Sequence, residues 1–115
     1  MSRIDLHLHT THSDGSFSTR DVMAFAKQAG VTALAITDHG NMFGAISFYK
    51  YAKDAGVKAI LGAELEVVAV SHGHHLPVLA ATEEGYKNLV ALVSRGYVDP
   101  DPGGHPGVPC VPLSA

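Results

Sequence analysis

Short apolar runs alternate with segments of helical periodicity along most of this sequence. Residues 33–37 (ALAIT) and 58–70 (KAILGAELEVVAV) are typical of buried strands, and residues 3–9 and 76–81 predict two more. Apolar residues at helical spacing predict three helices, over residues 19–29, 43–55 and 83–93. Strands that alternate with helices favour parallel pairing with right-handed crossovers, so we expect an α/β fold with mainly parallel strands.

Capping residues mark where the predicted helices begin and end. Ser18 and Thr82 stand at the positions expected of N-caps. Gly30 and Gly56 follow the first two helices, where glycine commonly ends a helix. These signals fix the helix boundaries independently of the apolar pattern.

The last part of the chain has a different composition. Of the six prolines, five lie at residues 100, 102, 106, 109 and 112, and no helical or strand periodicity is visible there. We therefore predict one domain over residues 1–97 and an irregular Pro/Gly-rich tail over residues 98–115.

Length and charge exclude some classes of protein. The chain has 115 residues, enough for one hydrophobic core, and a formal net charge of −3, which disfavours nucleic-acid binding through a general basic surface. The single cysteine, Cys110, cannot form an internal disulfide, and no apolar run is long enough to span a membrane. The N-terminus lacks the apolar stretch of a signal peptide, so we expect a cytoplasmic protein with no membrane partner.

Histidine is unusually frequent. The chain has eight histidines, as many as its lysines and arginines together. Three of them (His7, His9, His12) lie within the first twelve residues, and His72, His74 and His75 lie within four, in a segment we expect to be a loop. Because histidine is the commonest metal ligand, such clusters suggest a metal site.

Histidines and acids fall where the predicted strands end. His7 and His9 close the first strand, Asp14 follows it, His39 follows the second, and Glu64 lies in the third. The carboxyl ends of parallel strands meet on one side of an α/β sheet, where ligands bind. We therefore expect these five residues to converge.

This residue set suits metal-assisted hydrolysis. His7 and His9, two positions apart on a strand, point the same way, so both imidazoles can bind one cation. Imidazole with carboxylate favours Zn, Mn or Fe, and a bridging carboxylate such as Glu64 allows two or three ions to lie close together. Such ions can activate water and hold the oxygens of a phosphate ester.

Each residue also has a simpler interpretation when it is taken alone. Asp14-Gly15 could be only a turn, and the residues around His39 could be a turn with a helix cap. Glu64 and Glu66 could form a solvated strand face. The metal hypothesis therefore depends on the whole set converging.

Three motifs resemble those of a known family. DLHLHTTHSDG (5–15), ALAITDHGN (33–41) and GAE (62–64) are similar to the first three motifs of the PHP (polymerase and histidinol phosphatase) domain, in the same order. TDHGNMFGAISFY (37–49) and EEGYKNL (83–89) resemble more narrowly the N-terminal PHP domains of bacterial DNA polymerase III alpha subunits. The resemblance covers about residues 3–97.

The resemblance implies a distorted (βα)7 TIM-like barrel with up to three divalent metal ions. It implies that His7 and His9 bind a first ion, Asp14 and His39 a second, and that Glu64 bridges the first and a third, with His75 on the third. The first five of these residues would form the catalytic site. Asp5 and Asp38 would orient imidazole rings.

The resemblance extends only to the N-terminal half of the family domain, so we expect a partial barrel. The implied activity is that of a metal-dependent phosphoesterase, acting on a phosphate ester or a nucleic-acid 3′ end as a 3′–5′ exonuclease. The alternatives are an inactive structural module of a DNA-directed DNA polymerase, with other replicative subunits as partners, or a stand-alone PHP phosphatase. Uncovered strand edges in a partial barrel would favour self-association.

Overall fold

The chain folds into strands and helices in the predicted order. The structure, a computed structural model, describes residues 3–69, 72–105 and 108–114. Its elements are β1 (Ile4–Asp5), α1 (Thr19–Gln28), β2 (Ala33–Ile36), α2 (Ala45–Ala55), β3 (Lys58–Ala69), β4 (His72–Leu79), α3 (Glu83–Val98) and β5 (Cys110–Pro112). Ser18 and Thr82 cap α1 and α3 through their side-chain oxygens, as predicted.

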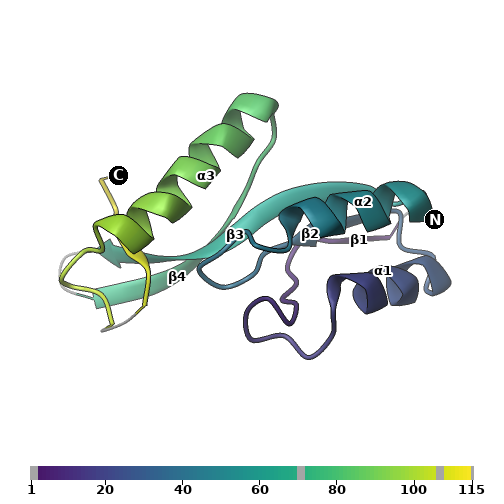
Figure 1. Cartoon of the computed structure of the whole chain (residues 1–115), viewed down its shortest axis with the longest axis horizontal. Helices are drawn as coiled ribbons and strands as arrows, with labels where there is room; N and C mark the ends of the chain where they lie inside the picture. The colour runs from purple at the N-terminus through teal and green to yellow at the C-terminus, as the bar shows by residue number, and fades with distance from the viewer. Residues whose placement is uncertain (1–2, 70–71, 106–107, 115) are drawn as a thin grey trace.

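The strands form one mixed sheet that curls into half a barrel (Figure 1). β1 pairs with β2 and β2 with β3 in parallel, β3 pairs with β4 in antiparallel fashion, and β5 joins β3 in parallel. The expectation of a partial, mainly parallel barrel is therefore confirmed. β3 joins the two ends of the sheet, because residues 58–61 pair with β2 and residues 62–69 pair with β4.

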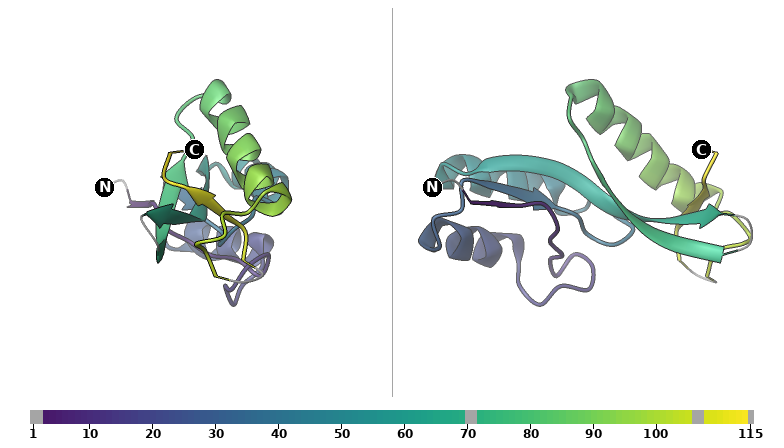
Figure 2. Two further views of the ribbon diagram at one scale, coloured as in Figure 1. Left: turned by 90° about the vertical axis from the view of Figure 1, so that its left-hand side faces the viewer. Right: turned by 180° about the vertical axis from the view of Figure 1, so that it is seen from behind.

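Two apolar clusters cover different parts of this sheet. α1 and α2 pack on β2 and the start of β3 around the fully buried Phe48. α3 packs on the second half of β3 and on β5 through Leu89 and Val93. The right-hand view of Figure 2 shows α1 and α2 toward one end and α3 toward the other end of an elongated molecule of 43 × 29 × 23 Å. Glu64 lies on β3 between Ala63 and Leu65, which both belong to the second cluster.

The first and fourth strands differ from the prediction. β1 ends at Asp5, although the alternating pattern runs to residue 9. Beyond Asp5, the backbone N–H and C=O of Leu8 both bond to the side chain of Thr37, which replaces a strand partner. β4 begins at His72, so the segment expected as a loop is part of a long hairpin with β3.

The prediction of an irregular tail is wrong for Cys110–Pro112, which form β5. β2 covers only the first part of one edge of β3, so the N–H and C=O groups farther along that edge need partners. β5 supplies them, and Leu113 continues the contact by donating its N–H to the carbonyl of Val68 at 2.9 Å. A strand of three residues between prolines is too short to show alternation. The domain boundary at residue 97 stays a prediction.

The helices in the described part of the chain are all too short or too polar to cross a membrane.

Candidate metal centre

The segment after β1 carries the first pair of histidines. Leu8 lies between them, donating its N–H to Thr37 Oγ1 at 2.9 Å and accepting the N–H of Thr37 at 2.8 Å. These bonds hold the segment in an extended conformation beside the end of β2. The imidazoles of His7 and His9 therefore project the same way, toward β3, with their ring centroids 5.1 Å apart.

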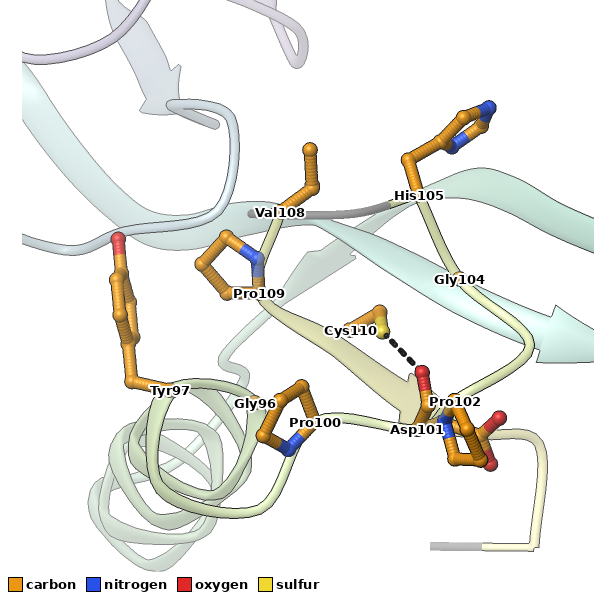
Figure 3. Close-up of a pocket in the computed structure, with 10 residues that line it drawn as sticks. All are labelled: Gly96, Tyr97, Pro100, Asp101, Pro102, Gly104, His105, Val108, Pro109 and Cys110. Atoms are coloured by element: carbon orange, nitrogen blue, oxygen red, sulfur yellow. Dashed lines mark hydrogen bonds between the residues drawn. The ribbon is translucent and has the colours of Figure 1, made fainter.

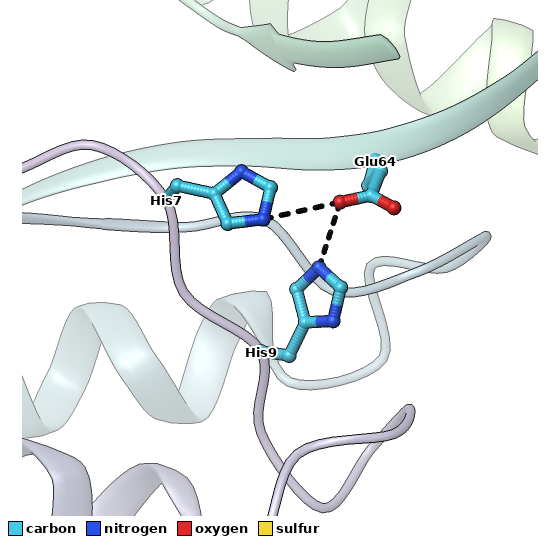
Figure 4. A group of neighbouring side chains, drawn as sticks. All are labelled: His7, His9 and Glu64. Atoms are coloured by element: carbon cyan, nitrogen blue, oxygen red, sulfur yellow. Dashed lines mark hydrogen bonds and ion pairs between the residues drawn. The ribbon is translucent and has the colours of Figure 1, made fainter. Parts of the chain in front are cut away.

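His7 and His9 meet the carboxylate of Glu64. Nε2 of His7 lies 3.2 Å and Nε2 of His9 lies 2.9 Å from the same oxygen, Oε2 (Figure 4). One nitrogen of each imidazole and one carboxylate oxygen lie within 4.8 Å of one another, so these three residues could hold a metal ion. The predicted convergence of His7, His9 and Glu64 is found.

The other oxygen of Glu64 faces a second group. Nδ1 of His75 lies 3.0 Å from Oε1, and the rings of His39 and His75 are 4.5 Å apart between centroids. His39, Glu64 and His75 also have ligand atoms within 4.8 Å of one another. Glu64 is thus shared by two groups, each of which contains two imidazoles.

The backbone around His39 explains how it reaches Glu64. His39 forms an isolated parallel bridge with Glu64, in which Glu64 N–H donates to the carbonyl of Asp38 at 2.9 Å. Gly40 N–H donates to the carbonyl of Glu64 at 2.8 Å. Gly40 has a φ of 70°, a conformation that favours glycine, and the chain turns away there after presenting His39.

The side chain of His39 has a nitrogen that a metal ion could bind. Nε2 of His39 is buried and has no hydrogen-bond partner in the described part of the chain. A buried polar atom without a partner costs free energy, on the order of 1–3 kcal/mol, and a cation would remove that cost. Imidazole and carboxylate together are the donor set of zinc, manganese and iron sites.

Asp14 lies at the edge of this centre rather than inside either group. Its carboxylate contacts Nδ1 of His9, and its side chain is 62% exposed. The resemblance implied that Asp14 and His39 share an ion. The structure places both on the wall of one cavity of about 230 Å³, together with Ser13 and Pro109.

The contact between His9 and Asp14 changes the pKa of both groups. Burial alone would lower the pKa of His9, but its hydrogen bonds to Glu64 and Asp14 outweigh burial and raise that pKa. Slight burial would raise the pKa of Asp14, but the hydrogen bond and charge of His9 lower it. Both shifts favour the charged pair, so protons compete with a metal ion for His9.

Asp5 and Asp38 were expected to orient imidazoles, but their hydrogen bonds go elsewhere. Asp5 accepts the backbone N–H of His7 at 3.0 Å. Asp38 accepts donors from Thr10 and Ser13. Both carboxylates hold the segment that bears the histidines.

A second buried acid was missed by the sequence interpretation. Glu66 is 1% exposed rather than part of a solvated face, and its carboxylate contacts Nδ1 of His105 from the tail. Gly73 on β4 pairs with Val68 and so lies diagonally from Glu66; it leaves room for the carboxylate, because a Cβ there would lie 2.7 Å from Glu66 Oε1. No local signal connects residues 66 and 105, since 39 positions separate them.

The tail also closes a cavity of about 360 Å³ beside the end of α3 (Figure 3). Tyr97, His105 and Pro109 are among the residues that line it, and Cys110 donates its S–H there to the carbonyl of Asp101 at 3.1 Å. The six predicted ligands do not contribute to its lining. Pro109 also lines the smaller cavity that holds Asp14 and His39, so the two cavities adjoin at this residue.

A known family model matches most of the chain. The model of the PHP domain matches residues 5–110. This match confirms the resemblance found in the three sequence motifs.

The curated relatives include a bacterial DNA polymerase subunit and a bacterial DNA polymerase. DNA polymerase III subunit alpha of Treponema pallidum is 43% identical over an alignment of 112 positions, which covers 86% of this chain and 10% of that protein. The error-prone DNA polymerase of Symbiobacterium thermophilum is 37% identical over an alignment of 129 positions, which covers 100% of this chain and 12% of that protein. The chain thus spans about a tenth of the length of these relatives.

Two solved structures share the fold. An amidohydrolase from Chromobacterium violaceum superimposes with a TM-score of 0.65 at 27% identity, covering 81% of this chain and 34% of that one. A candidate metal-dependent phosphoesterase from Bifidobacterium adolescentis gives a TM-score of 0.67 at 22% identity, covering 83% of this chain and 33% of that one. In both, the match is to about a third of a larger structure.

Proposed function

The chain belongs to the PHP domain family, and from this premise we propose that it provides the metal site of a phosphoesterase-type centre in a DNA polymerase III alpha-like protein. The observation that supports this proposal most directly is the carboxylate of Glu64. Its two oxygens face two separate groups, His7 with His9 and His39 with His75. A carboxylate shared in this way suits two neighbouring divalent ions.

The donor set narrows the choice of ion. Each group combines two imidazoles with one carboxylate oxygen, which favours Zn, Mn or Fe over Ca or Mg. His7, His9 and Glu64 would hold one ion, and His39, Glu64 and His75 another. Asp14 is the candidate for a further ligand, because it contacts His9 and lines the same cavity as His39.

Bound divalent ions would supply Lewis-acid stabilisation of the charge on a phosphate oxygen. The substrate class we infer is a phosphate ester, including a nucleic-acid 3′ end, since the curated relatives are a DNA polymerase III alpha subunit and an error-prone DNA polymerase. A net charge of −3 gives the chain little general attraction for a polyanion. Recognition would therefore depend on the ions. Other replicative polymerase subunits are the protein partners that the relatives suggest.

Metal binding is the first test. Equilibrium dialysis of the 115-residue chain against Mn²⁺ or Zn²⁺ should show bound metal, and His7→Ala and His75→Ala should each weaken it. His74→Ala is the matched control, because His74 pairs with Val67 and so lies on the opposite face of the hairpin from His75. A wild-type chain that binds neither ion would overturn the proposal.

Hydrolysis is the second test. With Mn²⁺ bound, the chain should release p-nitrophenol from bis(p-nitrophenyl) phosphate or shorten a 5′-labelled single-stranded DNA from its 3′ end. His39→Ala should abolish the release, and His74→Ala should preserve it.

A structural role is the second candidate. The potential ligands come from the segment after β1, the β2–α2 loop, β3 and β4, so a bound ion would tie four parts of the fold together. If the chain binds metal, melts at a higher temperature with it and hydrolyses neither substrate, then this candidate replaces the catalytic one.

A further inference from the structure

Asp38 is a buried carboxylate that contacts a loop rather than a metal ligand. It lies two residues beyond the end of β2 and is 1% exposed. Oδ1 accepts the backbone N–H of Thr10 and the hydroxyl of Ser13, the latter at 2.7 Å. Oδ2 accepts the hydroxyl of Thr10 at 2.7 Å. Both oxygens are therefore occupied by donors from one short stretch of chain.

That stretch is a tight loop. The carbonyl of Thr10 accepts the N–H of Ser13 at 3.0 Å and that of Gly15 at 2.9 Å. Gly15 lies so close to His9 that a Cβ on it would come within 2.3 Å of the His9 carbonyl oxygen. Thr10 itself is fully buried. The loop thus folds back on His9 and is anchored at Thr10.

The loop stands between two candidate ligands. His9 directly precedes Thr10, and Asp14 directly follows Ser13. Because β1 ends at Asp5, strand pairing does not fix this part of the chain. The side chain of Asp38 takes over that role for the loop.

We propose that Asp38 is a positioning residue, whose carboxylate holds the Thr10–Ser13 loop so that His9 and Asp14 face the metal centre. Its hydrogen bonds are observed independently, and its effect on metal binding rests on the proposed function. Burial of a carboxylate is costly unless donors compensate for it, and here three donors from Thr10 and Ser13 do so. A role in packing alone would be met more cheaply by an apolar residue.

The backbone and the side chain of Asp38 contact different metal groups. Its own carbonyl accepts the N–H of Glu64, and the next residue is His39, a member of the second group. Its side chain reaches the loop that follows His9, a member of the first group. Loss of the side-chain bonds should therefore weaken the group of His7, His9 and Glu64, and spare the group of His39, Glu64 and His75.

The test is Mn²⁺ titration by isothermal calorimetry on the wild-type chain and on Asp38→Ala, Asp38→Asn and Ser13→Ala. Residues that orient metal ligands typically contribute about 10- to 100-fold to metal affinity. Asp38→Ala should therefore weaken Mn²⁺ binding at the His7–His9 group by about that factor and leave the affinity of the His39–His75 group unchanged. Asp38→Asn keeps one acceptor oxygen for the Thr10 N–H and should recover part of the loss. Ser13→Ala removes one donor and should give a smaller loss in the same direction.

A stability control separates positioning from general support of the fold. Leu89→Ala opens the α3 cluster, which is made of residues other than the six candidate ligands, and should lower the melting temperature without changing Mn²⁺ affinity. If Asp38→Ala does not fold, the Mn²⁺ affinities of Ser13→Ala and Leu89→Ala distinguish positioning of the ligands from general support of the fold.

The inference is overturned if Ser13→Ala and Asp38→Asn bind Mn²⁺ with wild-type affinity, or if Leu89→Ala weakens binding as much as they do. A wild-type chain without Mn²⁺ or Zn²⁺ binding would instead overturn the proposed function, and the two failures are thus distinguishable.

Discussion

Nδ1 of His75 lies 3.0 Å from Oε1 of Glu64, although the two residues are not opposite each other in the β3–β4 hairpin. Glu64 pairs with Pro77, and His75 pairs with Glu66, so the contact runs diagonally across the ladder on one face of the sheet. The diagonal leaves Oε2 of Glu64 free for His7 and His9. One side chain thereby links the start of the chain to the hairpin.

Glu64→Gln should therefore weaken both classes of Mn²⁺ site together. The amide keeps the size of the side chain and one acceptor oxygen, but it removes the negative charge that two ions would share. We expect a loss on the order of 10- to 100-fold or more in each class, by calorimetric titration, because even residues behind the ligands contribute that much.

His75→Ala is the informative comparison for Glu64→Gln. It should weaken only the class of site formed with His39. Equal effects of the two variants on both classes would contradict a shared carboxylate.

Local periodicity was sufficient to predict part of this site. His7 and His9 are two positions apart in an extended segment, so their common direction follows from backbone geometry alone. His39 follows from the rule that parallel strands end on one side of a sheet, and Glu64, in the middle of β3, lies there because it bridges His39. His75 required the register of an antiparallel hairpin, which the residues alone do not specify, and only the family resemblance suggested it.

The tail shows where such prediction fails. The pairing of β5 with β3 and the contact of His105 with Glu66 join residues far apart in the sequence, and no repeating pattern marks them. Glutamate is usually a surface residue, yet Glu66 is buried because the tail covers it. Tertiary contacts decide both cases.

Removal of bound metal should lower the thermal stability of the chain. A ligand present at 100 times its Kd stabilises the folded state by about 2.7 kcal/mol. For a domain of this size, each kcal/mol changes Tm by roughly 4 °C. Differential scanning calorimetry with excess Zn²⁺ or Mn²⁺, then with a chelator, should show a decrease in Tm of about 10 °C.

The glutamine variant at Glu64 provides the control for this shift. Its Tm should respond much less to the same ions, since it lacks the shared carboxylate. A wild-type Tm that the chelator leaves unchanged would show that the ions do not support the fold.

His105→Ala should destabilise the chain, although the side chain of His105 is 67% exposed. The substitution leaves the carboxylate of Glu66, whose side chain is 1% exposed, without its imidazole partner. Loss of one partner from a buried polar pair costs about 1–3 kcal/mol. Urea unfolding should show this loss for His105→Ala and almost none for His74→Ala.

A double variant tests whether the two residues act together. In Glu66→Gln/His105→Ala, the loss should be smaller than the sum of the two single losses, because the buried charge is gone. Strict additivity would show that His105 contributes through some other contact.

The contact between His9 and Asp14 predicts a pH dependence for the metal-free chain. The pKa of His9 is raised, so its contribution to stability is complete below its ordinary value of 6.5 and is lost as pH rises through the raised value. The pKa of Asp14 is lowered, so its contribution is present above its ordinary value of 3.8 and is lost as pH falls through the lowered value. Both contributions are complete between these two ordinary values.

Asp14→Asn should therefore lower the free energy of unfolding most between about pH 4 and pH 6.5, with a smaller effect on either side. Because Asp14 is largely exposed and solvent screens the pair, the loss should stay below about 1 kcal/mol. Urea unfolding in a chelator at a series of pH values measures it. Asp54→Asn, at an exposed site on α2, is the matched control and should lack this window. A difference between wild type and Asp14→Asn that keeps growing as pH rises past the raised pKa of His9 would contradict the charged pair, because neutral His9 no longer attracts the carboxylate there.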